Sequence, residues 1–242
     1  MTSKIIAQGA EAKIILSKDT ITKDRISKSY RIPELDKKIR KSRTKAETKL
    51  LAKASEIINS PIPETSKEIH KIKMPFIDGK KLSDYLDKFP LAKQKQICKQ
   101  IGEDVAKLHD AEIIHGDLTT SNMILVENKI DMKNKIVNKK SKDDVKLIKR
   151  VVVGDGGLRI YFIDFGLGFI SRKFEDKAVD IHLFKQALEA KHFKNWEVLF
   201  KEFKKGYKNP WGGGRGRGEQ SQDSKIVFER LKAVEKRGRY KH

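Results

Sequence analysis

Two short segments constrain the fold of this chain more than any other feature: "IIHGDLTTSN" at 113–122 and "IDFG" at 163–166. In the first segment two apolar residues lead into His-Gly-Asp, and Asn122 follows Asp117 by five positions. The apolar runs "MILV" (123–126) and "RIYFID" (159–164) predict short buried strands next to these segments. We therefore expect one pocket to bring Asp117, Asn122 and Asp164 together from two distant stretches of the chain.

The order of the predicted elements indicates the fold class. Residues 4–26 alternate as three short strands, and Pro33 opens a helix over 33–58 that carries Arg43, Glu47, Leu50 and Ala54 on one stripe. The other predicted elements are two extended pieces within 68–79, a short helix near 81–86, and helices over 91–110, 175–191, 194–208 and 223–236. This order predicts an α+β, bilobal protein-kinase-like fold. Its small β-rich N-lobe, with one long helix, spans 1–76, and its reduced α-helical C-lobe spans 77–242.

Positive charge dominates the composition. Lysine and arginine number 54 against 33 aspartates and glutamates, which gives a formal net charge of +21. Such a field attracts polyanions and makes nucleic acid the leading macromolecular partner, although a lysine-rich proteome or thermal adaptation also explains an excess of this kind. The basic stretches are a predicted insertion at about 128–158, partly ordered as a hairpin, a flexible linker "GGGRGRG" at 212–218, and a tail at 225–242.

Cysteine and histidine usage limits the possible metal chemistry. Cys98 is the only cysteine, which excludes an internal disulfide and a multi-cysteine zinc site. The histidines form no HxxxH pair, so a metal would need oxygen ligands. The apolar stretch "IYFIDFGLGFI" is too short to span a bilayer and contains Asp164. We expect a soluble, cytoplasmic protein without a membrane partner.

The three oxygen-bearing side chains suit phosphoryl transfer, which requires mainly that phosphates, metal and acceptor be held in line. Asp164 is predicted to bind Mg²⁺ on the ATP phosphates, with Asn122 as a second ligand, because Mg²⁺ prefers oxygen. Asp117 is predicted to orient the attacking hydroxyl or water. Lys23, on the third strand, is predicted to reach the ATP phosphates and to pair with Glu47. The alternatives are an ordinary surface lysine and a solvated helix carboxylate.

Two further assignments concern residues near the predicted pocket. Met74, Phe76 and Ile77 lie in the expected link between the lobes, where adenine can bond to backbone groups, unless this stretch is a plain connector. His115 is interpreted as a structural residue outside the chemistry.

Several segments together resemble one family. They are "QGAEA" (8–12), "KSYRIPELDKKIRKSRTKAE" (28–47), "IIHGDLTTSN", "IDFGLGFIS" (163–171), "EDKAVDIHLFKQAL" (175–188) and "KRGRYKH" (236–242). They are similar to the small atypical, RIO-like kinase/ATPase subunit of the KEOPS complex. The resemblance implies a subunit that hydrolyses ATP beside a threonylcarbamoyl transferase and supports threonylcarbamoyladenosine formation on tRNA. It also implies contacts with other KEOPS subunits. In the tail, Val227, Leu231 and Val234 mark one apolar helix face. This pattern predicts a docked last helix followed by an exposed basic arm that touches tRNA phosphate or the transferase, unless the arm is only a solvated charged terminus.

The same resemblance assigns an unusual phosphate loop to Gly9, Ala10 and Glu11. Small residues allow close backbone approach there, but the carboxylate of Glu11 near phosphates is unfavourable unless Lys23 or another cation offsets it. Gly116 stands where many regulated kinases carry an arginine, and the helix expected at Glu175 follows "DFG" closely. Both features favour ATP hydrolysis over phosphorylation of a protein substrate.

Two other hypotheses remain open from the sequence. The first is a small-molecule phosphotransferase of the aminoglycoside or choline kinase type, which also uses HGDxxxxN and a metal-binding aspartate. The second is a basic tRNA-binding scaffold that has a kinase shape without catalysis. A dependence of ATP turnover on a small alcohol or amine would favour the first, and activity that survives Asp164→Ala would favour the second.

Overall fold

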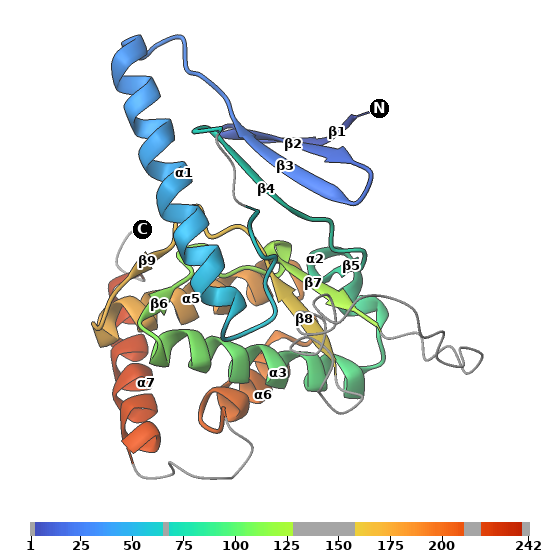
Figure 1. Cartoon of the computed structure of the whole chain (residues 1–242). Coiled ribbons are helices and arrows are strands. Elements are labelled where there is room, and N and C mark those ends of the chain that lie inside the picture. The colour runs from blue at the N-terminus through green and yellow to red at the C-terminus, as the bar shows by residue number, and fades with distance from the viewer. Residues whose placement is uncertain (1–2, 65–67, 128–157, 211–218, 239–242) are drawn as a thin grey trace, which may run out of the picture.

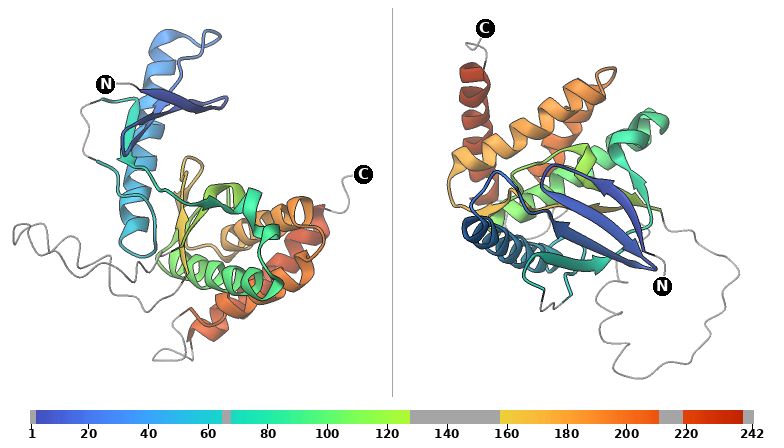
Figure 2. Two further views of the ribbon diagram at one scale, coloured as in Figure 1. Left: turned by 90° about the vertical axis from the view of Figure 1, so that its right-hand side faces the viewer. Right: turned by 90° about the horizontal axis from the view of Figure 1, so that it is seen from above.

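A computed structural model describes residues 3–64, 68–127, 158–210 and 219–238. The predicted insertion at 128–158, apart from Leu158, the linker at 212–218 and the last residues of the tail lie outside this description. The described residues form the predicted α+β arrangement, in which a small sheet and one long helix lie beside a mainly helical part (Figures 1 and 2).

The first part is a four-stranded antiparallel sheet in the order β1-β2-β3-β4. Its strands are β1 (Lys4–Gln8), β2 (Ala12–Ser17), β3 (Thr20–Arg25) and β4 (Lys71–Pro75). The three strands predicted within 4–26 are thus confirmed. The prediction of a second extended piece within 68–79 is wrong. The chain leaves the sheet after Pro75 and pairs with another strand again only at β5 (Lys80–Lys81). Just before β5, Gly79 lies close against β7. A Cβ added to this residue would lie 2.6 Å from Leu125 O.

Helix α1 (Pro33–Ser55) connects the sheet to the rest of the molecule. It begins at Pro33, whose missing N–H would have no helical partner in a first turn. Buried Asp36 fixes this end, because it accepts hydrogen bonds from Arg40 Nε at 2.6 Å, Ser27 Oγ at 3.0 Å and the Lys28 N–H at 3.2 Å. The helix ends three residues before the predicted boundary at Ile58, and the chain then continues in a turn.

The second part is built around α3 (Leu91–Asp110), with the predicted bounds. Ile97, Ile101, Val105 and Leu108 on its predicted apolar stripe are buried. The other elements are α2 (Leu82–Tyr85), α5 (Phe174–Lys191), α6 (Trp196–Tyr207), α7 (Glu219–Gly238), the 3₁₀ turns η1 (Leu86–Lys88) and η2 (Thr120–Asn122), and strands β5, β6 (Ile113–Ile114), β7 (Met123–Val126), β8 (Arg159–Phe162) and β9 (Phe169–Ile170).

The short strands place the motif segments side by side. β7 pairs with both β5 and β8, and β6 pairs with β9, all antiparallel. The β6–β9 pair was not predicted, because strands of two residues carry no measurable periodicity. These pairings bring residues 113–122 and 159–170 together although the insertion separates them in sequence.

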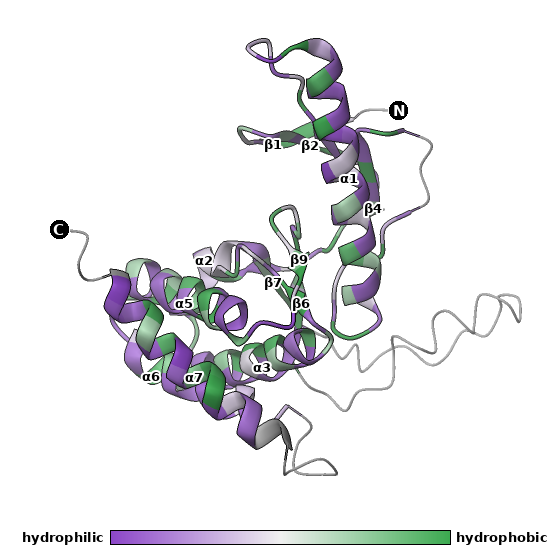
Figure 3. Ribbon diagram, turned by 90° about the vertical axis from the view of Figure 1, so that its left-hand side faces the viewer, coloured by the Kyte–Doolittle hydropathy of each residue, from purple (hydrophilic) through white to green (hydrophobic). Residues whose placement is uncertain are grey.

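The last helix docks on the molecule as expected. Val227 and Leu231 of α7 are buried and Val234 is partly buried against the core. Arg237 near the end of α7 pairs with Glu175 on α5 at 2.5 Å. The green and purple segments of Figure 3 show this amphipathic pattern along α7. None of the helices among the described residues is long and apolar enough to cross a bilayer.

Candidate active site

An ion-pair network joins three of the predicted site residues. Lys23 Nζ on β3 lies 2.7 Å from Glu47 Oε1 on α1 and 2.6 Å from Asp164 Oδ1, just after β8. The side chains of Lys23 and Glu47 are 9% and 1% exposed, whereas that of Asp164 is 47% exposed. The lysine is therefore a buried cation whose second partner opens towards solvent.

Arg25 is a further member of this network that the sequence reasoning did not identify. Its Nη2 lies 2.5 Å from Glu47 Oε2, and its side chain is buried. Lys23 and Arg25 are two positions apart on one strand, so their side chains project from the same face of the sheet. This spacing of two residues along a strand was the sequence signal that could have identified Arg25 as a neighbour of Lys23. Glu47 thus receives one cation on each carboxylate oxygen.

The predicted phosphate loop, Gly9 to Glu11, forms the turn between β1 and β2. Glu11 Oε2 lies 2.7 Å from Arg43 Nη1 and 4.0 Å from Arg25 Nη1. The expected cation near Glu11 is thus supplied by Arg43 and Arg25 rather than by Lys23. The Ile26 N–H donates to Glu11 O at 3.0 Å, and Lys28 Nζ donates to Ala10 O. These contacts attach the loop to β3, to the segment that follows β3, and to α1.

Asp117 and Asn122 form the second half of the site. Asn122 Nδ2 donates to both the backbone oxygen and Oδ2 of Asp117, each at 2.9 Å. The backbone oxygen of Asn122 accepts from the Ile163 N–H at 2.9 Å. This last bond ties Asn122 to the residue directly before Asp164. The structure thus brings the two motif segments into contact, as expected.

Asp180 on α5 holds the loop that carries Asp117. It accepts the backbone N–H groups of His115 and Gly116, each at 2.9 Å, and its Oδ2 lies 3.2 Å from His109 Nε2. Burial alone would raise the pKa of Asp180, but these hydrogen bonds outweigh it and lower the pKa below its ordinary value. This role of Asp180 was not predicted, because the residue lies in a helical segment, 64 positions after Gly116.

His115, which was interpreted from the sequence as a structural residue, lies inside the fold. It is fully buried, and its Nε2 lies 3.2 Å from the backbone oxygen of Ile163. Burial lowers the pKa of His115, which favours the neutral imidazole.

Gly116 has a steric reason to be glycine. Its φ is +78°, and an added Cβ would lie 2.2 Å from Leu167 O. Any side chain at this position would therefore meet both backbone strain and a direct clash. The absence of an arginine here follows from the close packing of residue 116 on the segment after "DFG".

The surroundings of Asp164 fit a magnesium ligand. Burial alone would raise its pKa, but the charge and hydrogen bond of Lys23 outweigh burial, so the pKa is lowered and the carboxylate is ionised at neutral pH. The neighbouring Gly166 keeps space open, since an added Cβ would lie 3.0 Å from Asp164 Oδ1 and 3.4 Å from Lys23 Nζ. The amide nitrogen of Asn122 is used by Asp117, which leaves its side-chain oxygen to act as a ligand.

Asp164 and Asn122 carry the kind of oxygen ligand that Mg²⁺ prefers. No group of three or more histidine, cysteine, aspartate or glutamate side chains that could hold a metal occurs among the described residues. Mg²⁺ commonly takes one or two protein oxygens and completes its shell with phosphates and water. Asp164 and Asn122 fit that arrangement.

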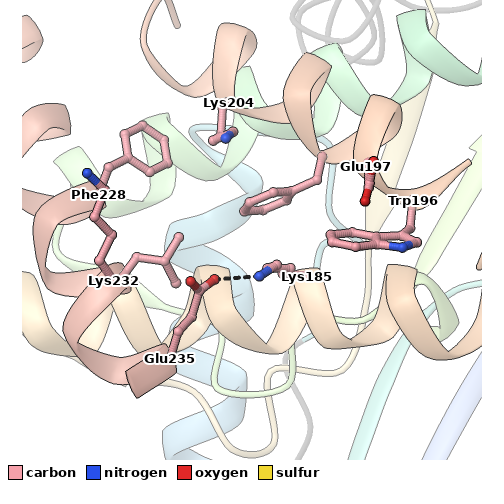
Figure 4. Close-up of a pocket in the computed structure, with 9 residues that line it drawn as sticks. Lys185, Trp196, Glu197, Lys204, Phe228, Lys232 and Glu235 are labelled. Atoms are coloured by element: carbon pink, nitrogen blue, oxygen red, sulfur yellow. Dashed lines mark hydrogen bonds and ion pairs between the residues drawn. The ribbon is translucent and has the colours of Figure 1, made fainter. Parts of the chain in front are cut away.

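The predicted adenine link follows β4 between the two parts of the molecule. Met74 is partly buried against the core, whereas Phe76 is 39% exposed. Ile77 is intermediate in exposure. A separate pocket between α5, α6 and α7 contains none of the predicted ATP-binding residues (Figure 4). One of its cations, Lys185, is already paired with Glu235 at 2.7 Å.

Fold and site together define a protein-kinase-like protein. A family model described as "RIO domain" matches residues 16–150. The KEOPS complex subunit Bud32 of Pyrococcus abyssi is 37% identical over 250 residues, which cover 98% of this chain and 96% of that protein. The chain therefore belongs to the RIO-domain family and, within it, to the Bud32 group of KEOPS subunits.

Other similar proteins show the same relationship. A probable serine/threonine-protein kinase BUD32 homolog of Archaeoglobus fulgidus is 34% identical, with 96% of this chain and 94% of that protein covered. A probable bifunctional tRNA threonylcarbamoyladenosine biosynthesis protein of Methanobrevibacter smithii is 35% identical over all of this chain. The match covers only 38% of that longer protein.

Solved structures support the fold alone. The Rio2 kinase of Chaetomium thermophilum, in a complex with ADP/Mg²⁺ and phosphoaspartate, superposes with a TM-score of 0.53 and 15% identity. The match covers 96% of this chain and 70% of that structure. WaaP in complex with acyl carrier protein gives a TM-score of 0.50 at 13% identity, over 97% of this chain and 88% of that one.

Proposed function

We propose that this chain is the ATP-hydrolysing, atypical serine/threonine kinase-like subunit of a KEOPS complex and supports threonylcarbamoyladenosine formation on tRNA. The observation that carries the proposal is the Lys23 side chain, which lies between Glu47 and Asp164. A lysine held by a buried glutamate beside an aspartate that can bind metal is the arrangement that protein kinases use for phosphoryl transfer. The names of full-length relatives support the tRNA and KEOPS assignment.

Each site residue has a task in ATP hydrolysis. Lys23 would contact the ATP phosphates and Glu47 would hold it in position. Asp117, fixed by Asn122, would orient the attacking water or hydroxyl. Mg²⁺ bound by Asp164 and Asn122 would neutralise phosphate charge. The nucleotide would also meet the loop at Gly9, Ala10 and Glu11 and, through its adenine, the backbone near Met74, Phe76 and Ile77.

The segment after Asp164 favours water over a peptide as the acceptor. Helix α5 begins at Phe174, so only residues 167–173 separate it from "DFG", and part of this stretch is used by β9. Gly116 provides no side chain for pairing with a phosphorylated loop. Little chain therefore remains to build a peptide-binding platform.

The expected partners are the threonylcarbamoyl transferase, other KEOPS subunits and tRNA, in the cytoplasm. We place the lobe boundary between residues 76 and 77, where the chain leaves β4 for the helical part. The tail from 225 begins within the docked α7, and any arm that reaches tRNA or the transferase would start beyond that helix.

The decisive experiment measures release of labelled phosphate from ATP by wild type and by Asp164→Ala. Each protein is assayed alone, with the transferase subunit, and with transferase and tRNA. We expect slow turnover by the isolated chain, faster turnover with both partners, and loss of turnover in Asp164→Ala under all conditions. Equal rates for the two proteins would contradict the proposal.

A further inference from the structure

Helix α1 has two chemically different halves. Successive residues turn by about 100° around a helix axis, so residues three or four apart lie on the same side. The buried half carries Asp36, Thr44, Glu47, Leu50, Leu51 and Ala54. The opposite half carries exposed lysines, which we call the lysine face: Lys37, Lys38, Lys41, Lys45, Lys49 and Lys53.

The lysine face is regularly spaced. From Lys37 to Lys53 a lysine recurs at every fourth residue. Each step advances about 6 Å along the helix, so the band is roughly 24 Å long and winds diagonally across the outer half. Helix α1 lies at the edge of the molecule and extends beyond the sheet (Figures 1 and 2). The band is therefore placed where a large partner can reach it.

These lysines have no acidic partners among the described residues. The only acidic residue between Lys37 and Lys53 is Glu47, which is buried and paired with Lys23 and Arg25. On α3, by contrast, Lys99 and Lys107 pair with Glu103 and Asp104. Like charges four residues apart destabilise a helix. A lysine-rich composition explains the number of lysines but not their segregation on one unneutralised face.

The residues between the lysines restrict the kind of partner. The exposed positions there include Ser42, Ala46 and Ala52, whose short side chains do not extend as far from the helix as the lysines. Protein interfaces are rich in aromatic and apolar anchors and poor in lysine. A membrane-surface helix needs an exposed apolar face, and the outer half of α1 has no large exposed apolar side chain between Lys37 and Lys53; the exposed Leu35 lies before this band. Lysine is a point charge on a flexible stem and is well suited to phosphate.

We infer that the lysine face of α1 is a docking surface for the phosphate backbone of folded RNA. The inference rests on the proposed function for the identity of the RNA, which is tRNA. The binding itself does not depend on ATP turnover. Because a helix is only about 10–12 Å thick, RNA on this face would lie one helix width from Glu47. Docking would restrain the helix that positions Lys23, so bound RNA should raise the rate of ATP hydrolysis.

The test compares two variants that lose the same charge. Lys41→Gln/Lys45→Gln/Lys49→Gln removes the centre of the lysine face. The matched control, Lys191→Gln/Lys194→Gln/Lys201→Gln, removes exposed lysines from the α5–α6 region. Affinity for tRNA is measured by fluorescence anisotropy over a range of salt concentrations. We expect the first variant to bind at least about tenfold more weakly and to lower the slope of log K against log salt by roughly two to three.

The control variant should change both quantities much less. Equal weakening in the two variants would show that binding reflects overall charge, and unchanged binding in the first would exclude the lysine face; either result overturns the inference. Competition by polyglutamate as effective as competition by RNA would assign the face to acidic proteins instead and also overturns it. The melting temperature of the first variant should not fall, because like-charge repulsion is removed.

ATP turnover separates this inference from the proposed function. Without RNA the first variant should hydrolyse ATP at the wild-type rate, and added tRNA should no longer stimulate it. Asp164→Ala should bind tRNA normally while losing turnover. Wild-type protein that binds tRNA through the lysine face without hydrolysing ATP would contradict only the proposed function.

Discussion

Arg25 Nη2 lies 2.5 Å from Glu47 Oε2, so the carboxylate that holds Lys23 is itself held by a second buried cation. Lys23 alone would have to neutralise Glu47 and reach towards Asp164 at the same time. With Arg25 on the other oxygen, Glu47 would remain paired with a cation if Lys23 turned towards the phosphate proposed to bind there. Arg25 is therefore a positioning residue for the Lys23–Glu47 pair.

Arg25→Ala should destabilise the protein and weaken ATP binding. The change leaves the buried Glu47 with a single cation, and we expect a loss of about 2–4 kcal/mol in the free energy of unfolding. The Michaelis constant for ATP should rise, because Lys23 would be held more tightly by Glu47. Urea denaturation and steady-state kinetics measure the two effects. Arg25→Lys, which restores a charge without the second donor, should recover part of both, and a wild-type Michaelis constant in Arg25→Ala would exclude the positioning role.

Asp180→Asn should lower the free energy of unfolding at neutral pH. It should also make that free energy change less as the pH is lowered. The pKa of Asp180 is below its ordinary value of 3.8 in the folded protein, so its ionised form stabilises the fold above about pH 4. That contribution is lost as the pH falls through the folded pKa. An asparagine has one acceptor oxygen for the N–H groups of His115 and Gly116, and we expect a loss of about 1–3 kcal/mol.

The measurement is the free energy of unfolding of both proteins between pH 7 and pH 2. The two curves should converge at the acid end, because the protonated aspartate resembles the amide. Parallel curves would show that Asp180 does not contribute through its charge.

Gly116→Ala should be strongly destabilising, whereas Gly9→Ala should be tolerated. The alanine at 116 meets a left-handed backbone, which costs about 1–2 kcal/mol, and a contact of 2.2 Å with Leu167 O. An added Cβ at residue 9 has Ala12 O at 4.0 Å as its nearest neighbour. Thermal unfolding of the two variants tests the difference, and equal melting temperatures would contradict the packing of residue 116 on the segment after "DFG".

Cys98 should resist thiol reagents in the folded protein. It is fully buried, and burial raises the pKa of its thiol, so little reactive thiolate forms. Iodoacetamide should label the chain in denaturant but leave it unlabelled over the same period in native buffer. Rapid native labelling would mean that α3 opens locally, since this helix carries the residue.

Local features of the sequence were sufficient for most elements. The bounds of α3 and β7 agree with the predicted ranges, because a repeat of apolar residues or a compact apolar run marks each one. The end of α1 and the piece after Pro75 were less well predicted, since tertiary contacts decide where the chain leaves a helix or sheet. The β6–β9 pair was missed because its strands are too short to show a pattern.

The sequence by itself determined which chemical groups were available: three carboxylates, an amide and a lysine, in an order that phosphoryl transfer uses. Only the tertiary structure decided that Arg25 shares Glu47, that Arg43 faces Glu11, and that Asp180 holds the loop of Asp117. The reason is physical. Charged and hydrogen-bonding partners are chosen by distance in space, and distances between remote residues are fixed only when the apolar surfaces of α1, α3 and α5 pack.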